Sequence, residues 1–380
     1  MHLPENIRFI LLVVAEVLLA PCLFIPYLAK IFPRSKVLLV MGIVGAGLLM
    51  KVPFSPYIYG IAITIGVNII LAVGLNLVNG FTGQFSLGHA GFMAVGAYSS
   101  AAVTNLLGPK ILPLSVQHAH PWLAALFFLA ALGTGGVCAA LAGLVVGIPS
   151  LRLKGDYLAI VTLGFGEIIR VVFQNMDAVG ASRGWSISSQ YTNLFWTYAL
   201  AAFTIYFVVS LVNSTYGRGF LAVRDDEIAA EAVGINTTKF KVIAFVIAAG
   251  FAGIGGGLSA HYIQFISPGD FNFMLSVSVV TMVILGGMGS TPGVILAAVL
   301  LTLLPEGLRA FAESSFLDNA IRVVFHSLTP EHFATAQAKT KALFGNRMIF
   351  YSILLIIFML TRPQGLFGDA NAIRRRPHKK

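Results

Sequence analysis

The sequence predicts an all-α, polytopic membrane protein, and three features of its composition lead to this fold class. Of the 380 residues, 57% are hydrophobic and only 11% are charged, whereas soluble domains carry about 25% charged residues. The apolar residues gather in runs, and a run of roughly 17–25 residues is long enough to cross a bilayer as a helix. The 39 glycines suit helices that pack through small residues. A large water-soluble core is therefore not expected.

Eleven apolar runs are candidate transmembrane helices. They lie near residues 7–29, 37–50, 57–78, 90–107, 122–148, 157–173, 194–212, 242–266, 274–287, 292–304 and 347–361. Three of them, 37–50, 274–287 and 292–304, are short, and short interrupted segments often mark irregular structure at a transport site. The expected bundle therefore has about 9–11 transmembrane helices with a broken or re-entrant segment. The first run is expected to be retained, since it lacks the basic start of a signal peptide.

The positions of lysine and arginine predict the orientation of the bundle. With the C-terminus inside, the cytoplasmic segments are 30–36, 149–156, 213–241 and 362–380, and they hold fifteen of the 25 cations. This agreement favours eleven spans with the N-terminus outside. It also explains the net charge of +10 as a positive-inside bias, so no nucleic-acid partner is expected. The basic tail either contacts anionic lipid or is simply solvated.

One stretch, Asn76–Tyr98, organises the expected bundle because it interrupts two apolar runs with glycines and small polar residues. Its glycines disfavour a helix, since glycine costs up to about 1 kcal/mol relative to alanine. Irregular backbone at membrane depth is tolerated only where protein buries it or water reaches it. The candidate pathway residues can satisfy freed backbone groups and also face a solute; they are Thr82, Gln84, Ser86 and His89. Two interpretations stay open, a broken segment lining a translocation route and an ordinary polar hairpin loop.

Few charged residues fall inside the expected spans. Glu167 and Arg170 are three residues apart and can pair on one helix face. An intramembrane ionisable residue is a candidate for a transport role, although this pair can also neutralise itself near the interface. Two G-x-x-x-G spacings, beginning at Gly143 and Gly253, are expected to pack helices together rather than to contact a solute.

The cytoplasmic segment 213–241 is expected to contain a short helix lying along the membrane surface. Asp225 and Asp226 are candidate caps for its start, and Glu227 favours the positive end of the helix. Gly234 fits the end of the helix. A small apolar face is expected from Ile228, Ala229, Ala232 and Val233. The alternative is an ordinary connecting loop.

No catalytic or cofactor site is expected in this chain. It lacks the G-x-x-x-x-G-K-[ST] phosphate-binding loop, so ATP would have to be hydrolysed by a separate chain. No nucleophile–base set is visible, and no cysteine spacing suggests a metal site. We therefore expect a non-enzyme with no metal and no cofactor of its own.

Five stretches carry a resemblance to a known family. They read GLNLVNGFTGQFSLGHAGFMAVGAY, GDYLAIVTLGFGEIIR, RDDEIAAEAVGINTTKFKVIAFVIAAGFAGIGGGL, LGGMGSTPGVILAA and RPQGLFG. In this order they resemble the branched-chain amino acid permease family, and within it the LivM-type subunit. The resemblance runs from about Tyr57 to Gly368. It implies a permease subunit of an ATP-binding-cassette importer for branched-chain or hydrophobic amino acids, in a bacterial plasma (inner) membrane.

The resemblance also implies partners, namely a second permease subunit, two ATP-binding subunits and a soluble substrate-binding protein. In such importers a short cytoplasmic helix docks on the ATPase. Its glutamate-alanine-alanine pattern, followed after three residues by glycine, is matched loosely here because Ile228 interrupts its start. The candidate coupling residues are Asp225, Asp226, Glu227, Glu231 and Gly234.

Two other functions stay open. One is the same machine carrying urea or short amides. The other is a secondary transporter or channel working alone, which would need more acidic residues inside the membrane for ion coupling.

The chain is expected to divide into four parts. Residues 1–56 form accessory N-terminal helices, 57–304 the permease core, 305–346 an extracytoplasmic helical insertion, and 347–380 the last span with its basic cytoplasmic tail. The insertion departs from the family, where a short connection is usual. It either contacts the binding protein or shields the outer mouth, or it is a tolerated surface insertion, since loops accept length cheaply.

Overall fold

The computed structural model describes residues 55–111, 121–150 and 156–312, with isolated positions at 45–47 and 352–365. Several predicted parts lie outside these residues or touch them only at isolated positions: the spans 7–29, 37–50 and 347–361, and the insertion after Ala312. The division of the chain into four parts therefore stays a prediction.

Eight helical stretches of the described part are long and apolar enough to cross a membrane, two of them, at α5 and α14, only together with the short helical turns that adjoin them. They are α4 (Pro56–Asn76), α5 (His89–Ala102), α8 (Pro121–Ser150), α9 (Asp156–Gln174), α10 (Leu194–Val212), α13 (Thr237–Ile263), α14 (Phe273–Gly286) and α15 (Thr291–Ala312). They coincide with the eight apolar runs predicted there, so the all-α polytopic fold is confirmed. The largest difference is at α15, which continues past the predicted end at 304 and contains Pro305.

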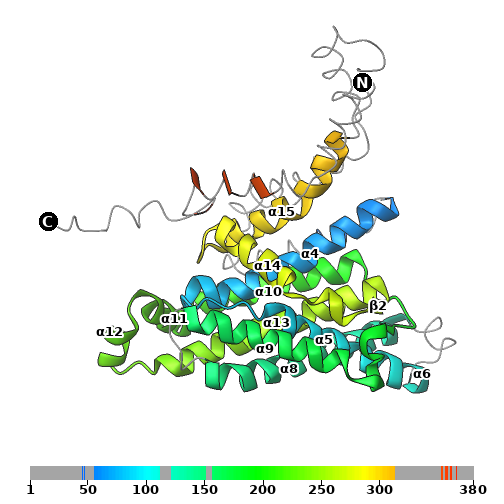
Figure 1. Ribbon diagram of the computed structural model, residues 1–380, viewed down its shortest axis with the longest axis horizontal. Helices are drawn as coiled ribbons and strands as arrows, with labels where there is room; N and C mark the ends of the chain where they lie inside the picture. Colours follow the sequence, from blue (N-terminus) through cyan, green and yellow to red (C-terminus); the bar gives the residue numbers. More distant parts are fainter. Residues whose placement is uncertain are drawn as a thin grey trace, which may run out of the picture.

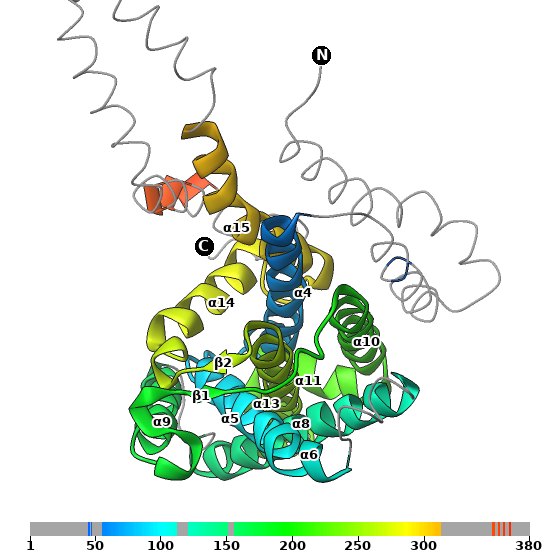
Figure 2. The ribbon, with the colours of Figure 1, turned by 90° about the vertical axis from the view of Figure 1, so that its right-hand side faces the viewer.

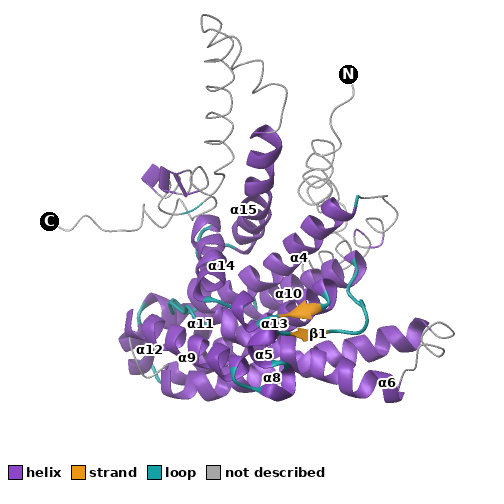
Figure 3. Cartoon of the chain, turned by 45° about the vertical axis from the view of Figure 1, so that its right-hand side comes forward, coloured by secondary structure: helices purple, strands orange, loops and turns teal. Residues whose placement is uncertain are grey.

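Short elements connect these helices. They are the π-helical turns η2 (Leu77–Phe81) and η3 (Val103–Leu107), the helices α6 (Gly108–Ile111), α11 (Thr215–Asp225) and α12 (Glu227–Ala232), and the 3-10 turns η4 (Asp177–Val179), η5 (Ala181–Arg183) and η6 (Pro268–Asp270). Two strands, β1 (Trp185–Ser186) and β2 (Phe265–Ile266), pair antiparallel, and Figure 3 shows them in orange against the helices.

The connections gather at two ends of the bundle. Figure 1 places α11 and α12 at one end, and α6 with β2 at the other; we call these the α12 end and the strand end. At the strand end, Asn105 Nδ2 donates a hydrogen bond of 2.8 Å to the Ser186 carbonyl. The segment between α4 and α5 and the α14–α15 loop lie at the α12 end, where both approach Arg224 of α11. The chain therefore crosses the bundle back and forth, as expected for a polytopic protein.

Helices α5, α8 and α13 pack at backbone distance through glycines, and Figure 2 shows these three helices side by side. A Cβ atom placed on Gly135 of α8 would lie 2.7 Å from the carbonyl oxygen of Gly96 on α5. A Cβ placed on Gly253 of α13 would lie 2.7 Å from the carbonyl oxygen of Gly135. Only glycine allows this contact, so the packing role predicted for Gly253 is confirmed. Gly143 has the same role, since its Cβ would lie 2.5 Å from that of Ala249.

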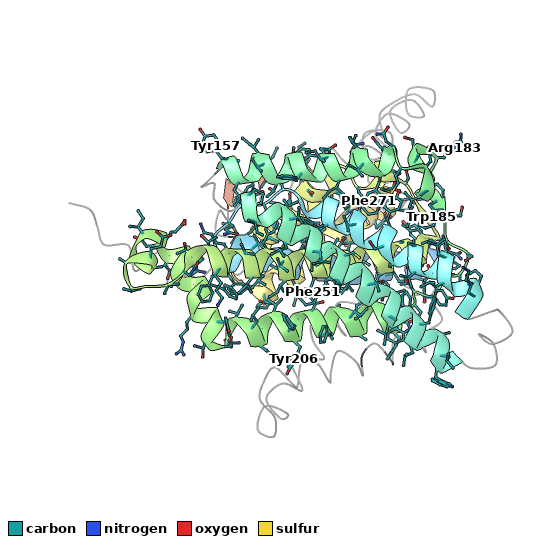
Figure 4. The ribbon with its side chains drawn as sticks, turned by 90° about the horizontal axis from the view of Figure 1, so that it is seen from below. Tyr157, Arg183, Trp185, Tyr206, Phe251 and Phe271 are labelled. Atoms are coloured by element: carbon teal, nitrogen blue, oxygen red, sulfur yellow. The ribbon has the colours of Figure 1, made fainter. Side chains whose placement is uncertain are left out.

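The outer faces of the bundle are apolar. In Figure 4, Tyr157 of α9 and Tyr206 of α10 project from opposite edges, whereas Phe251 of α13 lies between the helices. Large apolar side chains also project from α8, and Val137 and Val145 are 60% and 70% exposed. Exposed apolar patches of this kind mark contact with lipid or with another membrane subunit.

The pairing predicted for Glu167 and Arg170 is confirmed. Arg170 Nη2 lies 2.7 Å from Glu167 Oε2, and the two side chains are 26% and 33% exposed. The pair is partly exposed on α9, so it neutralises itself without entering the core of the bundle.

The glycine contact predicts a difference between two neighbouring positions of α8. Gly135→Val should destabilise the protein by about 1–3 kcal/mol, because a side chain there must push α5 away. Gly133→Val is the matched control, since nothing lies within 4 Å of a Cβ placed on Gly133 and both variants carry the same helix propensity cost. The measurement is the midpoint temperature at which the detergent-solubilised protein loses its monodisperse peak. Equal midpoints for the two variants would contradict the packing argument.

Candidate functional site

The helical structure of the chain is interrupted between α4 and α5. Helix α4 ends at Asn76, the π-helical turn η2 covers Leu77–Phe81, and α5 begins at His89. Residues 82–88 are not helical, and Gly83 has a φ of +68°, a conformation that favours glycine. The predicted break in the helical chain is therefore confirmed.

The polar side chains of the break point into the protein. Thr82, Gln84, Ser86 and His89 are each at most 5% exposed. Phe85, between two of them, is 36% exposed. The segment thus lies at the surface of the α12 end with its polar side inward, which does not fit an ordinary exposed hairpin loop.

Three side chains accept hydrogen bonds from the backbone N–H groups that the break leaves free. Asn79 Oδ1 accepts from Ser86 N at 3.3 Å, and Thr162 Oγ1 of α9 accepts from Leu87 N at 3.1 Å. Ser276 Oγ of α14 accepts from the backbone N of Ala90 at 3.0 Å. Because unpaired backbone groups are costly away from water, these bonds fix the break against α9 and α14. The roles of Thr162 and Ser276 were not predicted, although Thr162 lies within a motif that carried the resemblance.

The four candidate pathway residues differ in whether their side chains bond to the freed backbone, and their role in a pathway stays a prediction. Thr82 does bond to freed backbone, since its Oγ1 donates to the Val78 carbonyl at 2.7 Å. Gln84 does not, because neither of its side-chain polar atoms has a hydrogen-bond partner among the described residues, and His89 Nε2 has none either. Local side chains alone therefore do not satisfy the break; the long-range partners on α9 and α14 do so.

Further unpaired atoms lie just before the break, at the end of α4 and in η2. Besides Gln84 and His89, the side-chain nitrogens of Asn76 and Asn79 are buried without a partner in the described part of the chain. A buried polar group without a hydrogen bond costs about 1–3 kcal/mol. These atoms can therefore gain partners when a polar solute passes or when the segment changes conformation.

The α14–α15 loop closes over the same segment. Asn76 Oδ1 accepts a hydrogen bond of 3.0 Å from Gly289 N, and a Cβ placed on Gly80 would overlap that nitrogen. On the other side of the loop, Gly365 is buried and its Cβ would lie 2.5 Å from Gly287 Cα. Stretches far apart in the sequence thus meet at the α12 end: the break, the LGGMGS loop and Gly365.

Helices α11 and α12 build an exposed projection at this end. Asp226 caps α12, since its carboxylate accepts from the backbone N–H groups of Ile228 and Ala229 at 2.9 and 3.0 Å. Gly234, with a φ of +86°, ends α12, and the backbone N–H of Ile235 bonds to the Ala230 carbonyl, as in a Schellman motif. The predicted short helix and its end are therefore confirmed.

The acidic residues of this segment have different roles. Asp225 is not a cap as predicted; it pairs with Arg224, whose Nη2 lies 3.1 Å from Asp225 Oδ1. Glu227 pairs with Lys241 at 2.7 Å, and Glu231 accepts a hydrogen bond from Thr237 at 2.7 Å. These contacts fasten α12 to the start of α13.

Two large aliphatic side chains are exposed at α12, Ile228 within the helix and Val233 at its C-cap. Ile228 and Val233 are 74% and 76% exposed, while Ala230 is buried against the rest of the chain. A solvent-exposed helix that carries one large aliphatic side chain, with a second at its C-cap, is suited to contact another protein.

The comparisons with known proteins identify the family. The family model for the permease component of branched-chain amino acid transport systems matches residues 57–359. The chain belongs to this family. Its members in the comparison are transport permease proteins rather than enzymes, in agreement with the lack of a catalytic constellation in the sequence. No group of three metal-ligating side chains occurs within the described ranges.

Individual relatives differ in similarity. The chain is 36% identical over 286 residues to the high-affinity branched-chain amino acid transport system permease proteins LivM of Salmonella typhimurium and Escherichia coli, covering 66% of this chain and 63% of each relative. The chain thus spans less than two thirds of the length of these relatives. It is 24% identical over 263 residues to the permease protein LivH of Salmonella typhimurium, covering 66% of this chain and 84% of LivH. No solved structure matches.

The backbone bond from Ala90 to Ser276 predicts a local effect. Ser276→Ala removes the acceptor and should speed amide hydrogen exchange in residues 82–92 by about fivefold, since a net hydrogen bond contributes roughly 1 kcal/mol. Ser278→Ala is the matched control two residues later on α14, because within the described residues the Ser278 hydroxyl bonds to its own helix, at Met274 O. The measurement is hydrogen–deuterium exchange of peptides from this segment. The assignment fails if both variants exchange like the unmodified chain.

Proposed function

We propose that the chain is the LivM-type permease subunit of an ATP-binding-cassette importer for branched-chain amino acids. The observation that carries the proposal is the family match across residues 57–359, with higher identity to LivM than to LivH. A second permease of the LivH type, two ATP-binding subunits and a soluble substrate-binding protein complete the importer. The binding protein selects the amino acid, and the permease pair supplies the route.

The importer lies in the bacterial plasma membrane, with the α12 end and the C-terminus in the cytoplasm. The cation-rich segment 213–241, which contains α11 and α12, supports this orientation. The ATP-binding subunits then meet α12 at its exposed aliphatic side chains. ATP is bound and hydrolysed by those subunits, so this chain contributes no cofactor site.

The translocation path passes the break between α4 and α5. Thr82, Gln84, Ser86 and His89 face inward at the cytoplasmic end, and the unpaired atoms of Gln84 and His89 are free to exchange partners. They are uncharged amide, hydroxyl and imidazole groups, so a zwitterion can pass them without a fixed ion pair. In this proposal the segment is an inner gate that opens when the ATP-binding subunits move α12.

Uptake by the reconstituted importer tests the function directly. Proteoliposomes holding both permeases and the ATP-binding subunits, supplied with the binding protein, should accumulate labelled leucine only when ATP is present. Urea should not be accumulated. Accumulation of urea without leucine would replace the proposed cargo, and leucine uptake by this chain alone would contradict the ATP-driven machine.

The aliphatic side chains exposed at α12 predict a docking variant. Val233→Asp should reduce co-purification of the ATP-binding subunits by about tenfold, because a charge replaces a large exposed aliphatic contact. Thr238→Asp is the matched control; it adds the same charge at an exposed position in the first turn of α13, where an acid suits the helix dipole. Gly234→Trp is a poorer test, since the φ of +86° strains any side chain there. Equal retention of the ATP-binding subunits by the two variants would remove α12 from the interface.

The inner gate predicts a change of solvent access at the break. With Cys22 and Cys138 replaced by alanine, a Ser86→Cys variant should react with a water-soluble thiol reagent at a rate that differs about tenfold between nucleotide-free and ATP-bound importer. Ser100→Cys is the control, because Ser100 is fully buried in α5 and should stay unreactive in both states. An identical rate at position 86 in both states would support a static segment instead.

A further inference from the structure

Arg224 connects the α11–α12 projection to the break. A Cβ atom placed on Gly83 would lie 3.1 Å from Arg224 Cγ and 3.5 Å from its Cα, so the backbone of the break rests directly on the end of α11. Helix α11 also contacts the turn η2 that precedes the break. Gly83 has a φ of +68°, and with no side chain it leaves room for the stem of the arginine.

The far end of the Arg224 side chain reaches a second glycine. A Cβ placed on Gly289 in the α14–α15 loop would lie 3.1 Å from Arg224 Nη1. Gly289 also has a positive φ, +84°, and its N–H donates to Asn76 Oδ1 at 3.0 Å. One side chain therefore touches both the break and the loop that is hydrogen-bonded to the end of α4.

On the side of the projection, Arg224 is tied to the start of α12. Its Nε and Nη2 donate to Asp225 Oδ1 at 3.2 and 3.1 Å, and the next residue, Asp226, caps α12. Since α12 follows α11 after this single residue, a displacement of α12 reaches Arg224 with little slack. Arg224 is 37% exposed, and its contacts with Gly83 and Gly289 distinguish its position from that of a freely solvated surface cation.

We propose that Arg224 is the positioning residue that transmits movement of α12 to the break between α4 and α5. This inference rests on the proposed function, in which the ATP-binding subunits move α12. The stem of Arg224 pushes on Gly83, and its planar guanidinium bears on Gly289, so both sides of the inner gate move with α11. Lysine would keep the charge and the stem but lose the flat, forked group.

The alternative is that Arg224 acts only as one more cytoplasmic cation that orients the bundle. In that case Arg218, an exposed cation of the same helix, would be an equal contributor. The two residues therefore form a matched pair, since loss of either removes one positive charge from α11.

The test uses the complete importer in nanodiscs, with Ser86→Cys as the reporter and Cys22 and Cys138 replaced by alanine. Arg224→Ala should retain the ATP-binding subunits. The roughly tenfold ratio between its labelling rates in the nucleotide-free and ATP-bound states should fall to about one, a typical loss of coupling between sites. Uptake of leucine per ATP hydrolysed should fall with it. Arg224→Lys should give an intermediate value, and Arg218→Ala should behave like the parent.

The outcomes separate the inference from the function on which it rests. If the labelling rate of the parent importer does not depend on nucleotide, the proposed inner gate itself is contradicted. A full labelling difference in an assembled Arg224→Ala importer, or an equal loss in Arg218→Ala, overturns the role of Arg224. If Arg224→Ala fails to assemble, Arg224→Lys decides, because it keeps charge and stem; parent-like labelling in that variant also overturns the proposal.

Discussion

The structure depends on how a helix can be interrupted inside an apolar bundle. Where α4 gives way to the break, backbone N–H groups lose their helical partners and lie where water is scarce. Asn79, Thr162 and Ser276 supply the missing acceptors. Because two of these acceptors belong to α9 and α14, the interruption also decides which helices must stand beside it. The need of a few backbone N–H groups for hydrogen-bond acceptors thus decides how the helices are arranged at the α12 end of an otherwise apolar protein.

Glycine contacts provide the complementary constraint. Without water to drive helices together, close backbone approach gives the packing energy, and Gly96, Gly135 and Gly253 bring α5, α8 and α13 into contact. The same residue type serves a different purpose at the α12 end, where Gly83 and Gly289 make room for Arg224. The glycines thus allow close helix packing in the middle of the bundle and make room for an arginine at the α12 end.

The sequence predicted those features that depend on local pattern. Hydropathy gave the eight spans of the described part, the glycines and polar residues of 79–89 gave the break, and Asp226 with Gly234 gave the limits of α12. Features that depend on distant contacts were missed. Nothing in the pattern around Ser276 indicates that it accepts from Ala90, and Asp225 was predicted to be a cap because the local rules do not distinguish it from Asp226. The ion pair with Arg224 is what keeps the Asp225 carboxylate from capping α12. The separate helix α11 was also missed, since the whole segment 213–241 was expected to hold one short helix.

The central claim is that the break moves relative to the rest of the bundle when the importer binds ATP. The most direct measurement places spin labels at Phe85 of the break and at Ile263 at the strand end of α13, both exposed positions, in the complete importer. Pulsed electron paramagnetic resonance then records the distance between them with and without a non-hydrolysable ATP analogue. The account predicts two displaced distance distributions. A single distribution that does not change with nucleotide would contradict it.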